Sequence, residues 1–63
     1  MFKVGDRVKV IHIDCKDNSF NIGDIGEVLY GPTRSFFKGS PDVYLVEFGY
    51  QTDIVYENEI KHV

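Results

Sequence analysis

Short runs of β-branched and aromatic residues alternate with turn-forming residues along the entire 63-residue chain. No segment carries the i, i+3, i+4, i+7 apolar spacing of an amphipathic helix over more than one turn. Gly, Asp, Asn, Ser and Pro punctuate the runs, as expected between strands. We therefore predict an all-β chain. The expected strands are residues 7–13, 25–30, 42–48 and 53–57, followed by a short turn and a last few extended residues.

Two of these runs show the two-residue period of a strand with one buried face. Val8 and Val10 alternate with Arg7 and Lys9, and the apolar phase switches after Val10, which suggests a bulge or a sharp coil. In residues 42–48, one face carries aromatic and aliphatic side chains and the other carries a glutamate. The expected inward set of that run is Tyr44, Val46 and Phe48.

Five short strands in one domain, residues 1–63, admit few architectures. A flat meander would expose long strand edges and leave one face uncovered, whereas a small barrel avoids both problems. Strong curling requires glycine where strands approach closely. The stretch NIGDIGEV supplies it, and we expect Gly26 at a bend with close strand contact and Gly23 in the preceding turn.

Charge and cysteine content restrict the function. The net charge of −3 disfavours a general nucleic-acid binder, because such affinity depends on neutralising phosphates. The single cysteine, Cys15, permits no internal disulfide and fits a reducing compartment. The N-terminal stretch MFKVGDRVKV has no apolar run long enough for a signal peptide or a membrane span. A cytoplasmic protein without membrane contact is expected.

Four motifs in order resemble a known family: VGDRVKV, GDIGEV, YLVEF and YENEIKHV. They are similar to the Src-homology-3-like barrels, specifically the group related to the KOW motif. The resemblance covers nearly the whole chain and implies a five-stranded barrel with a single helical turn before the last strand. Short stand-alone proteins of this kind are similar to ones found in bacteria and in phage or prophage genomes. The resemblance also implies RNA or DNA contact as one function.

Residues 31–41, GPTRSFFKGSP, form an unusually long loop for so small a domain. Adjacent aromatics in an extended segment point to opposite sides, so at most one of Phe36 and Phe37 is expected to cover the core. An exposed aromatic beside Arg34 and Lys38 is typical of a protein interface or a base-stacking platform. The alternative is that both rings fold back over the core.

A second group of candidates is cationic: Lys3, Arg7 and Lys9, joined by Lys61 if the last strand lies beside the first. These side chains would contact phosphates locally. The alternative is a solvated strand face whose lysines discourage aggregation.

The sequence offers little support for metal binding or catalysis. His12, Cys15 and His62 match no standard zinc spacing, and no cofactor is expected. No nucleophile elbow or phosphate loop is present, so the chain is not expected to be an enzyme. Acidic residues crowd the C-terminal half and offer either a solvated surface or a face for a basic partner. They are Asp42, Glu47, Asp53, Glu57 and Glu59.

The preferred interpretation is a non-catalytic binding module that docks on another protein through residues 31–41. The first alternative is an RNA- or DNA-contacting module. The second is a structural homo-oligomer that pairs exposed strand edges, and a monomer or a weak homo-oligomer is the expected state.

Overall fold

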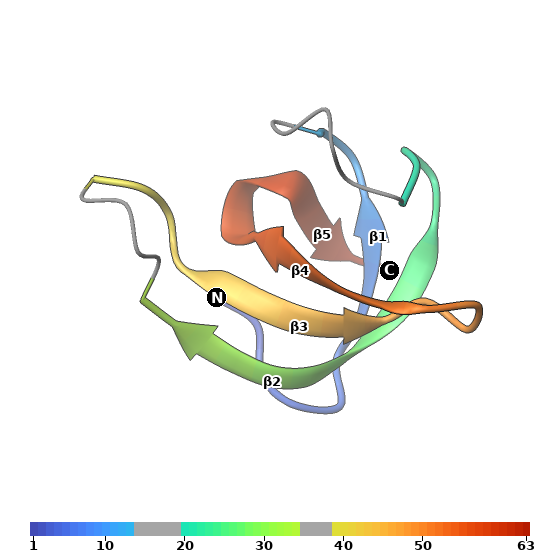
Figure 1. Ribbon diagram of the computed structural model, residues 1–63, viewed down its shortest axis with the longest axis horizontal. Coiled ribbons are helices and arrows are strands. Elements are labelled where there is room, and N and C mark those ends of the chain that lie inside the picture. The colour runs from blue at the N-terminus through green and yellow to red at the C-terminus, as the bar shows by residue number, and fades with distance from the viewer. Residues whose placement is uncertain (14–19, 35–38) are drawn as a thin grey trace.

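The computed structural model describes residues 1–13, 20–34 and 39–63 of the chain, which form one curled antiparallel sheet (Figure 1). Its strands and its one short 3-10 turn, η1, follow in chain order. They are β1 (Arg7–Val10), β2 (Ile25–Thr33), β3 (Val43–Glu47), β4 (Thr52–Tyr56), η1 (Glu57–Glu59) and β5 (Ile60–His62). The prediction of an all-β chain with a turn before the last strand is confirmed.

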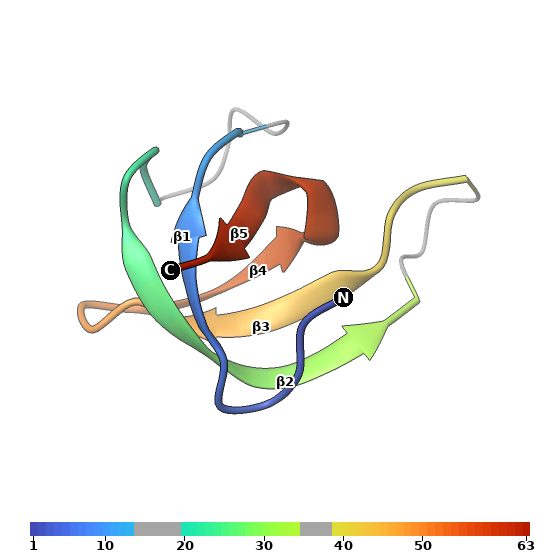
Figure 2. The ribbon, with the colours of Figure 1, turned by 180° about the vertical axis from the view of Figure 1, so that it is seen from behind.

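The spatial order of the strands is β4-β3-β2-β1-β5, so the last strand lies beside the first. Figure 2 shows the same curl from behind, with β2 sweeping round between β1 and β3. Among the described strands, no pairing joins the two edge strands β4 and β5. The expectation of a sheet that closes on itself is therefore wrong, and the sheet is strongly curled but open.

Strand bounds differ most from the sequence prediction in β1 and β2. β1 ends at Val10 rather than at residue 13, and the amide of Ile11 still donates to the carbonyl of Glu59, 2.8 Å away, in the register of β1 with β5. Ile11 is exposed, while Ile13 packs partly against the core. β2 runs on to Thr33, so the first three residues of the predicted loop 31–41 belong to a strand.

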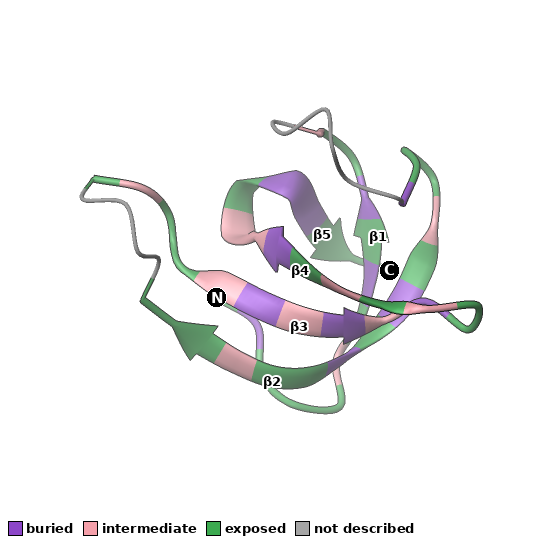
Figure 3. Cartoon of the chain, viewed as in Figure 1, coloured by how far each residue is buried: buried purple, intermediate pink, exposed green. Residues whose placement is uncertain are grey.

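The core lies on the concave side of the sheet. Along the strands, buried residues that face this side alternate with residues that are more exposed (Figure 3). The predicted inward set of Tyr44, Val46 and Phe48 is buried, and Phe20 anchors its loop by stacking on Phe48 at 5.4 Å between ring centroids. The buried apolar residues are Phe2, Val8, Val10, Phe20, Val28, Tyr44, Val46, Phe48, Val55 and Ile60.

Two register shifts explain how β2 follows the curl. Val28 pairs with Val46, but Tyr30 pairs with Leu45 and Thr33 with Val43, so β2 carries extra residues relative to β3. Each extra residue bends the strand and increases its twist. At Gly26 the strands touch: a β-carbon there would lie 2.6 Å from the carbonyl oxygen of Glu47. The predicted close strand contact at Gly26 is confirmed, and so is the turn at Gly23, which has a φ of +98°.

Candidate binding surfaces

The predicted docking segment, residues 31–41, leaves the sheet between two neighbouring strands. The pairing of Thr33 with Val43 holds β2 and β3 one strand spacing apart at the base of this segment. Arg34 follows directly after β2 and is exposed. Phe36, Phe37 and Lys38 lie outside the described residues, so their predicted role stays a prediction. What the structure establishes is a firm base for the segment with one exposed cation at its start.

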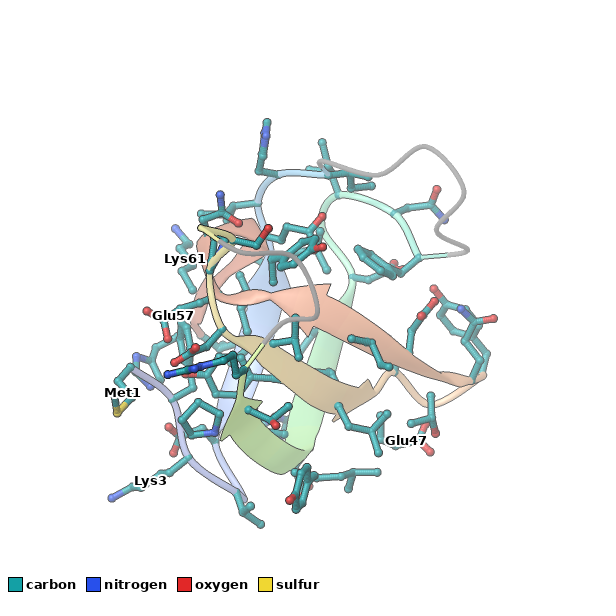
Figure 4. The ribbon with its side chains drawn as sticks, turned by 60° about the vertical axis from the view of Figure 1, so that its left-hand side comes forward. Met1, Lys3, Glu47, Glu57 and Lys61 are labelled. Carbon is teal, nitrogen blue, oxygen red and sulfur yellow. The ribbon has the colours of Figure 1, made fainter. Side chains whose placement is uncertain are left out.

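The register of β1 and β5 brings three of the four predicted ridge cations together. Lys9 stands directly opposite Lys61, and Arg7 follows on the same outward side of β1. All three are exposed, and within the described residues none takes part in an ion pair. We call Arg7, Lys9 and Lys61 the basic cluster. In Figure 4, Lys3 lies apart from Lys61, with Glu57 and Met1 between them, so Lys3 is not beside Lys61.

The outer face of β2, β3 and β4 carries an apolar row that the sequence analysis did not identify. Ile54 of β4 stands opposite Leu45 of β3, and Leu45 stands opposite Tyr30 of β2. Because the register shifts at Leu29, both Leu29 and Tyr30 face this position. Ile54 is 59% exposed, Tyr30 64% and Leu29 44%, with Leu45 half-buried. We call these four residues the apolar stripe. The outward phase of Leu45 was visible in the sequence, but its neighbours depend on the register.

The free edge of β4 is largely satisfied from within the chain. The amide of Glu57 donates to the carbonyl of Asp42. Because hydrogen-bonded and non-hydrogen-bonded pairs alternate along an antiparallel ladder, the amides of Ile54 and Tyr56 point away from β3. Each of these outward amides finds a carboxylate at 2.8 Å, Ile54 with Asp53 and Tyr56 with Glu59. Such capping leaves few donors for an added strand on this edge.

Two of the acidic residues that the sequence analysis grouped are structural. Glu59 is fully buried, and its side chain accepts the bond from Tyr56 at the start of η1. Glu57 accepts a 2.6 Å hydrogen bond from the Tyr44 hydroxyl, which itself accepts the amide of Phe2 at 3.1 Å. These contacts stabilise the fold, and the five acidic residues therefore do not form one common binding face.

Hydrogen bonds also join the ends of the chain. His62 Nε2 lies 3.0 Å from Asp6 Oδ2, and the His62 ring packs on Phe2 with a centroid distance of 4.6 Å. The contact with His62, followed by the Lys3 amide, lowers the pKa of the Asp6 carboxyl. Asp6 also accepts the amide of Lys3 at 3.0 Å, which shapes the turn leading into β1. The N-terminal segment is thus held against the sheet.

A tyrosine–aspartate contact joins two distant turns. The Tyr50 hydroxyl donates to Asp24 Oδ2, and Tyr50 stacks on Phe48 at 6.4 Å. The bond from Tyr50, helped by the Asn21 amide, lowers the pKa of Asp24 below its ordinary 3.8. Mainly the same bond raises the pKa of Tyr50 to about 12.

The pH dependence of this contact follows from the two shifts. Its contribution is present above pH 3.8 and is lost as the pH falls through the lowered Asp24 value. At the alkaline end it is present below pH 10.0 and is lost as the pH rises through about 12.

We expect Tyr50→Phe to raise the pKa of Asp24 toward 3.8 while leaving it below that value, because the Asn21 amide still donates. The measurement is an NMR titration of the Asp24 carboxyl carbon. Tyr30→Phe, at an exposed tyrosine on β2, is the matched control and should leave Asp24 unchanged. An identical Asp24 titration in Tyr50→Phe would show that the two turns are not coupled.

Residues 1–13, 20–34 and 39–63 contain no group of three or more potential ligands that could hold a metal ion. Cys15, which the zinc alternative required, lies outside them. None of the helical structure in these same ranges is long and apolar enough to cross a membrane.

Comparisons with protein-family models, with curated proteins and with solved structures found no match for this chain.

Proposed function

We propose that this chain is a non-catalytic, cytoplasmic binding module with a Src-homology-3-like, KOW-related fold. The strand order β4-β3-β2-β1-β5 and the turn between β4 and β5 support this assignment. So does the close approach at Gly26, within the GDIGEV motif on which the resemblance depends.

The partner in this proposal is another protein, and the docking element is the segment 31–41. One observation carries the proposal most directly: a paired base, Thr33 with Val43, presents the segment at the end of a curved strand, with Arg34 exposed beside it. A rigid scaffold that displays a loop is a common way to position binding residues. In the sequence, Phe36, Phe37 and Lys38 follow Arg34 and supply the aromatic and cationic anchors.

The proposal is tested by binding with purified components. A host-lysate capture identifies candidate partners by mass spectrometry, and each one is then purified and titrated against the wild type and a Phe36→Ala/Phe37→Ala double variant. We expect the double variant to weaken binding at least about tenfold, as for the loss of interface anchors. Its thermal midpoint should stay close to that of the wild type. The exposed Val4→Ala is the matched control.

Unchanged affinity in the double variant would exclude the segment as the docking element. Unfolding of the double variant would show instead that the two rings cover the core.

A second candidate function is contact with RNA or DNA through the basic cluster. The observation that favours it is the opposition of Lys9 and Lys61, two like charges without an ion-pair partner among the described residues. Phosphate binding would offset their repulsion.

The expected result under this alternative is a mobility shift of single- or double-stranded RNA or DNA that disappears between low and moderate salt. It should also disappear in Lys9→Gln/Lys61→Gln. A shift that persists in this variant would exclude the cluster as the contact.

A homo-oligomer built by edge-to-edge strand pairing is the least supported alternative. Two outward amides of β4 already bond to carboxylates, and β5 has only three residues. Light scattering at two protein concentrations distinguishes a monomer from such an assembly.

A further inference from the structure

The apolar stripe crosses three strands on the outer face of the described sheet. Tyr30, Leu45 and Ile54 come from three adjacent strands and stand in direct register, and Leu29 is the exposed residue before Tyr30 at the register shift. Four side chains of this size, about half exposed, present on the order of 300 Å² of apolar surface, in the range of functional patches on small monomers. Solubility alone would favour polar residues at outward strand positions.

The row of residues next to the stripe contains two glutamates. Glu27 of β2 stands directly opposite Glu47 of β3, and like charges in this position repel. Glu47 and Leu45 are two residues apart on the same face of β3, about 7 Å along the strand. Arg7 stands opposite Glu27 on its other side, but Glu47 lies on the far side of the view from Lys61 in Figure 4. Arg7 can thus offset the charge of Glu27, whereas Glu47 stands opposite Glu27 and Thr52 and has no cation opposite it.

The stripe is small for the interface of a stable dimer. A stable protein interface covers about 800 Å² on each partner. That would be about a fifth of the 4369 Å² surface of this chain, more than twice what the stripe supplies. A short segment of another protein is better matched, since a few apolar side chains would cover the stripe.

We propose that the apolar stripe binds a short amphipathic segment of a partner protein, with apolar side chains in one line and Lys or Arg along one flank. This inference rests on the proposed protein-binding function and names the chemistry of the partner. The apolar side chains cover Tyr30, Leu45 and Ile54, while the flanking cations approach Glu27 and Glu47. Charge complementarity sets the orientation of the segment and burial supplies the affinity.

The test uses a defined probe, an 18-residue amphipathic peptide of leucine, alanine and lysine with leucines on one face and lysines along one flank. A peptide of scrambled order and a peptide with glutamate in place of lysine are the comparison probes. Titration into ¹⁵N-labelled protein should give saturable shifts centred on Leu29, Tyr30, Leu45 and Ile54 for the first peptide. The comparison peptides should bind at least about tenfold more weakly.

Substitutions in the protein test the apolar contact and the charge complementarity separately. Tyr30→Ser/Ile54→Ser should weaken binding at least about tenfold, and Glu27→Lys about three- to tenfold with a larger effect at low salt. Ile22→Ser removes an equally exposed apolar side chain in the turn before β2, and it should change the affinity less than about twofold. Glu47 is left unchanged because it accepts hydrogen bonds from Gly49 and Thr52.

Several results would overturn the proposal. They are the absence of saturable binding at millimolar peptide, shifts centred on the basic cluster, and equal binding of the glutamate peptide. Concentration-dependent shifts of the stripe in the free protein would show that a second copy covers it.

The Phe36→Ala/Phe37→Ala variant distinguishes this inference from the proposed function. It should retain peptide binding at the stripe. If it also keeps full affinity for the purified partner, the docking role of the loop fails while the stripe proposal stands.

Discussion

Gly26→Ala is expected to destabilise the protein by about 2–4 kcal/mol, a large part of the roughly 3–9 kcal/mol typical of a domain of this length. A β-carbon at this position would lie 2.6 Å from both the carbonyl oxygen of Glu47 and a methyl carbon of Val46. The carbonyl oxygen belongs to the paired strand β3 and cannot move without disturbing the register of β2 with β3. The loss therefore comes from contact, and not from an unusual backbone angle.

Urea denaturation of the two proteins measures the effect, with the midpoint falling while the slope stays constant. Gly23→Ala is the matched control, because Gly23 has a φ of +98° and open space around its missing β-carbon. Its cost should be limited to backbone strain, about 1–2 kcal/mol. Equal losses in the two variants would mean that β2 and β3 do not approach as closely as described.

Tyr44→Phe is expected to cost about 1–3 kcal/mol, although it removes a single oxygen atom. The hydroxyl of this buried tyrosine accepts the amide of Phe2 at 3.1 Å and donates to Glu57 at 2.6 Å. Phenylalanine fills the same space and leaves both partners without this contact. Burial, followed by the bond to Glu57, also raises the pKa of the Tyr44 hydroxyl, so the neutral donor form persists through the physiological range.

Thermal unfolding measures the total loss, and hydrogen exchange locates it. The amide of Phe2 should exchange much faster in Tyr44→Phe, while the amides of β2 and β3 change only in line with global stability. Tyr30→Phe is the control at an exposed position on β2. Unchanged exchange at Phe2 would show that the hydroxyl does not hold the N-terminal segment.

The local features of the fold were readable from residue types. The two-residue period placed Val8, Val10, Tyr44 and Val46 inward, and the structure buries all four. Gly23 and Gly26 were predicted from the need for a turn and a close approach. Strand ends were less accurate: β1 ends at Val10 rather than at residue 13, and β2 continues to Thr33. Where a strand ends depends on its pairing with other strands, which lie far away in the sequence.

The candidate surfaces were likewise predicted only in part. The opposition of Lys9 and Lys61 follows from a strand order that was expected, whereas the separation of Lys3 was not. The apolar stripe escaped prediction because a one-residue register shift between Val28 and Tyr30 leaves both Leu29 and Tyr30 exposed and puts Tyr30 opposite Leu45. A shift of this kind depends on which residues pair across strands, and no pattern within one strand records it.

The sequence by itself determined the class of the chain: strands rather than helices, their inward residues, and the glycines that allow the sheet to curl. These properties depend on the preferences of neighbouring residues, which act over a few positions. Only the tertiary structure decided the register between β2 and β3, the open gap between β4 and β5, and the capping of the outward amides of Ile54 and Tyr56. Those features involve residues that come into contact only after the chain has folded. Their free energies come from interactions between pairs of residues and cannot be assigned to single residues.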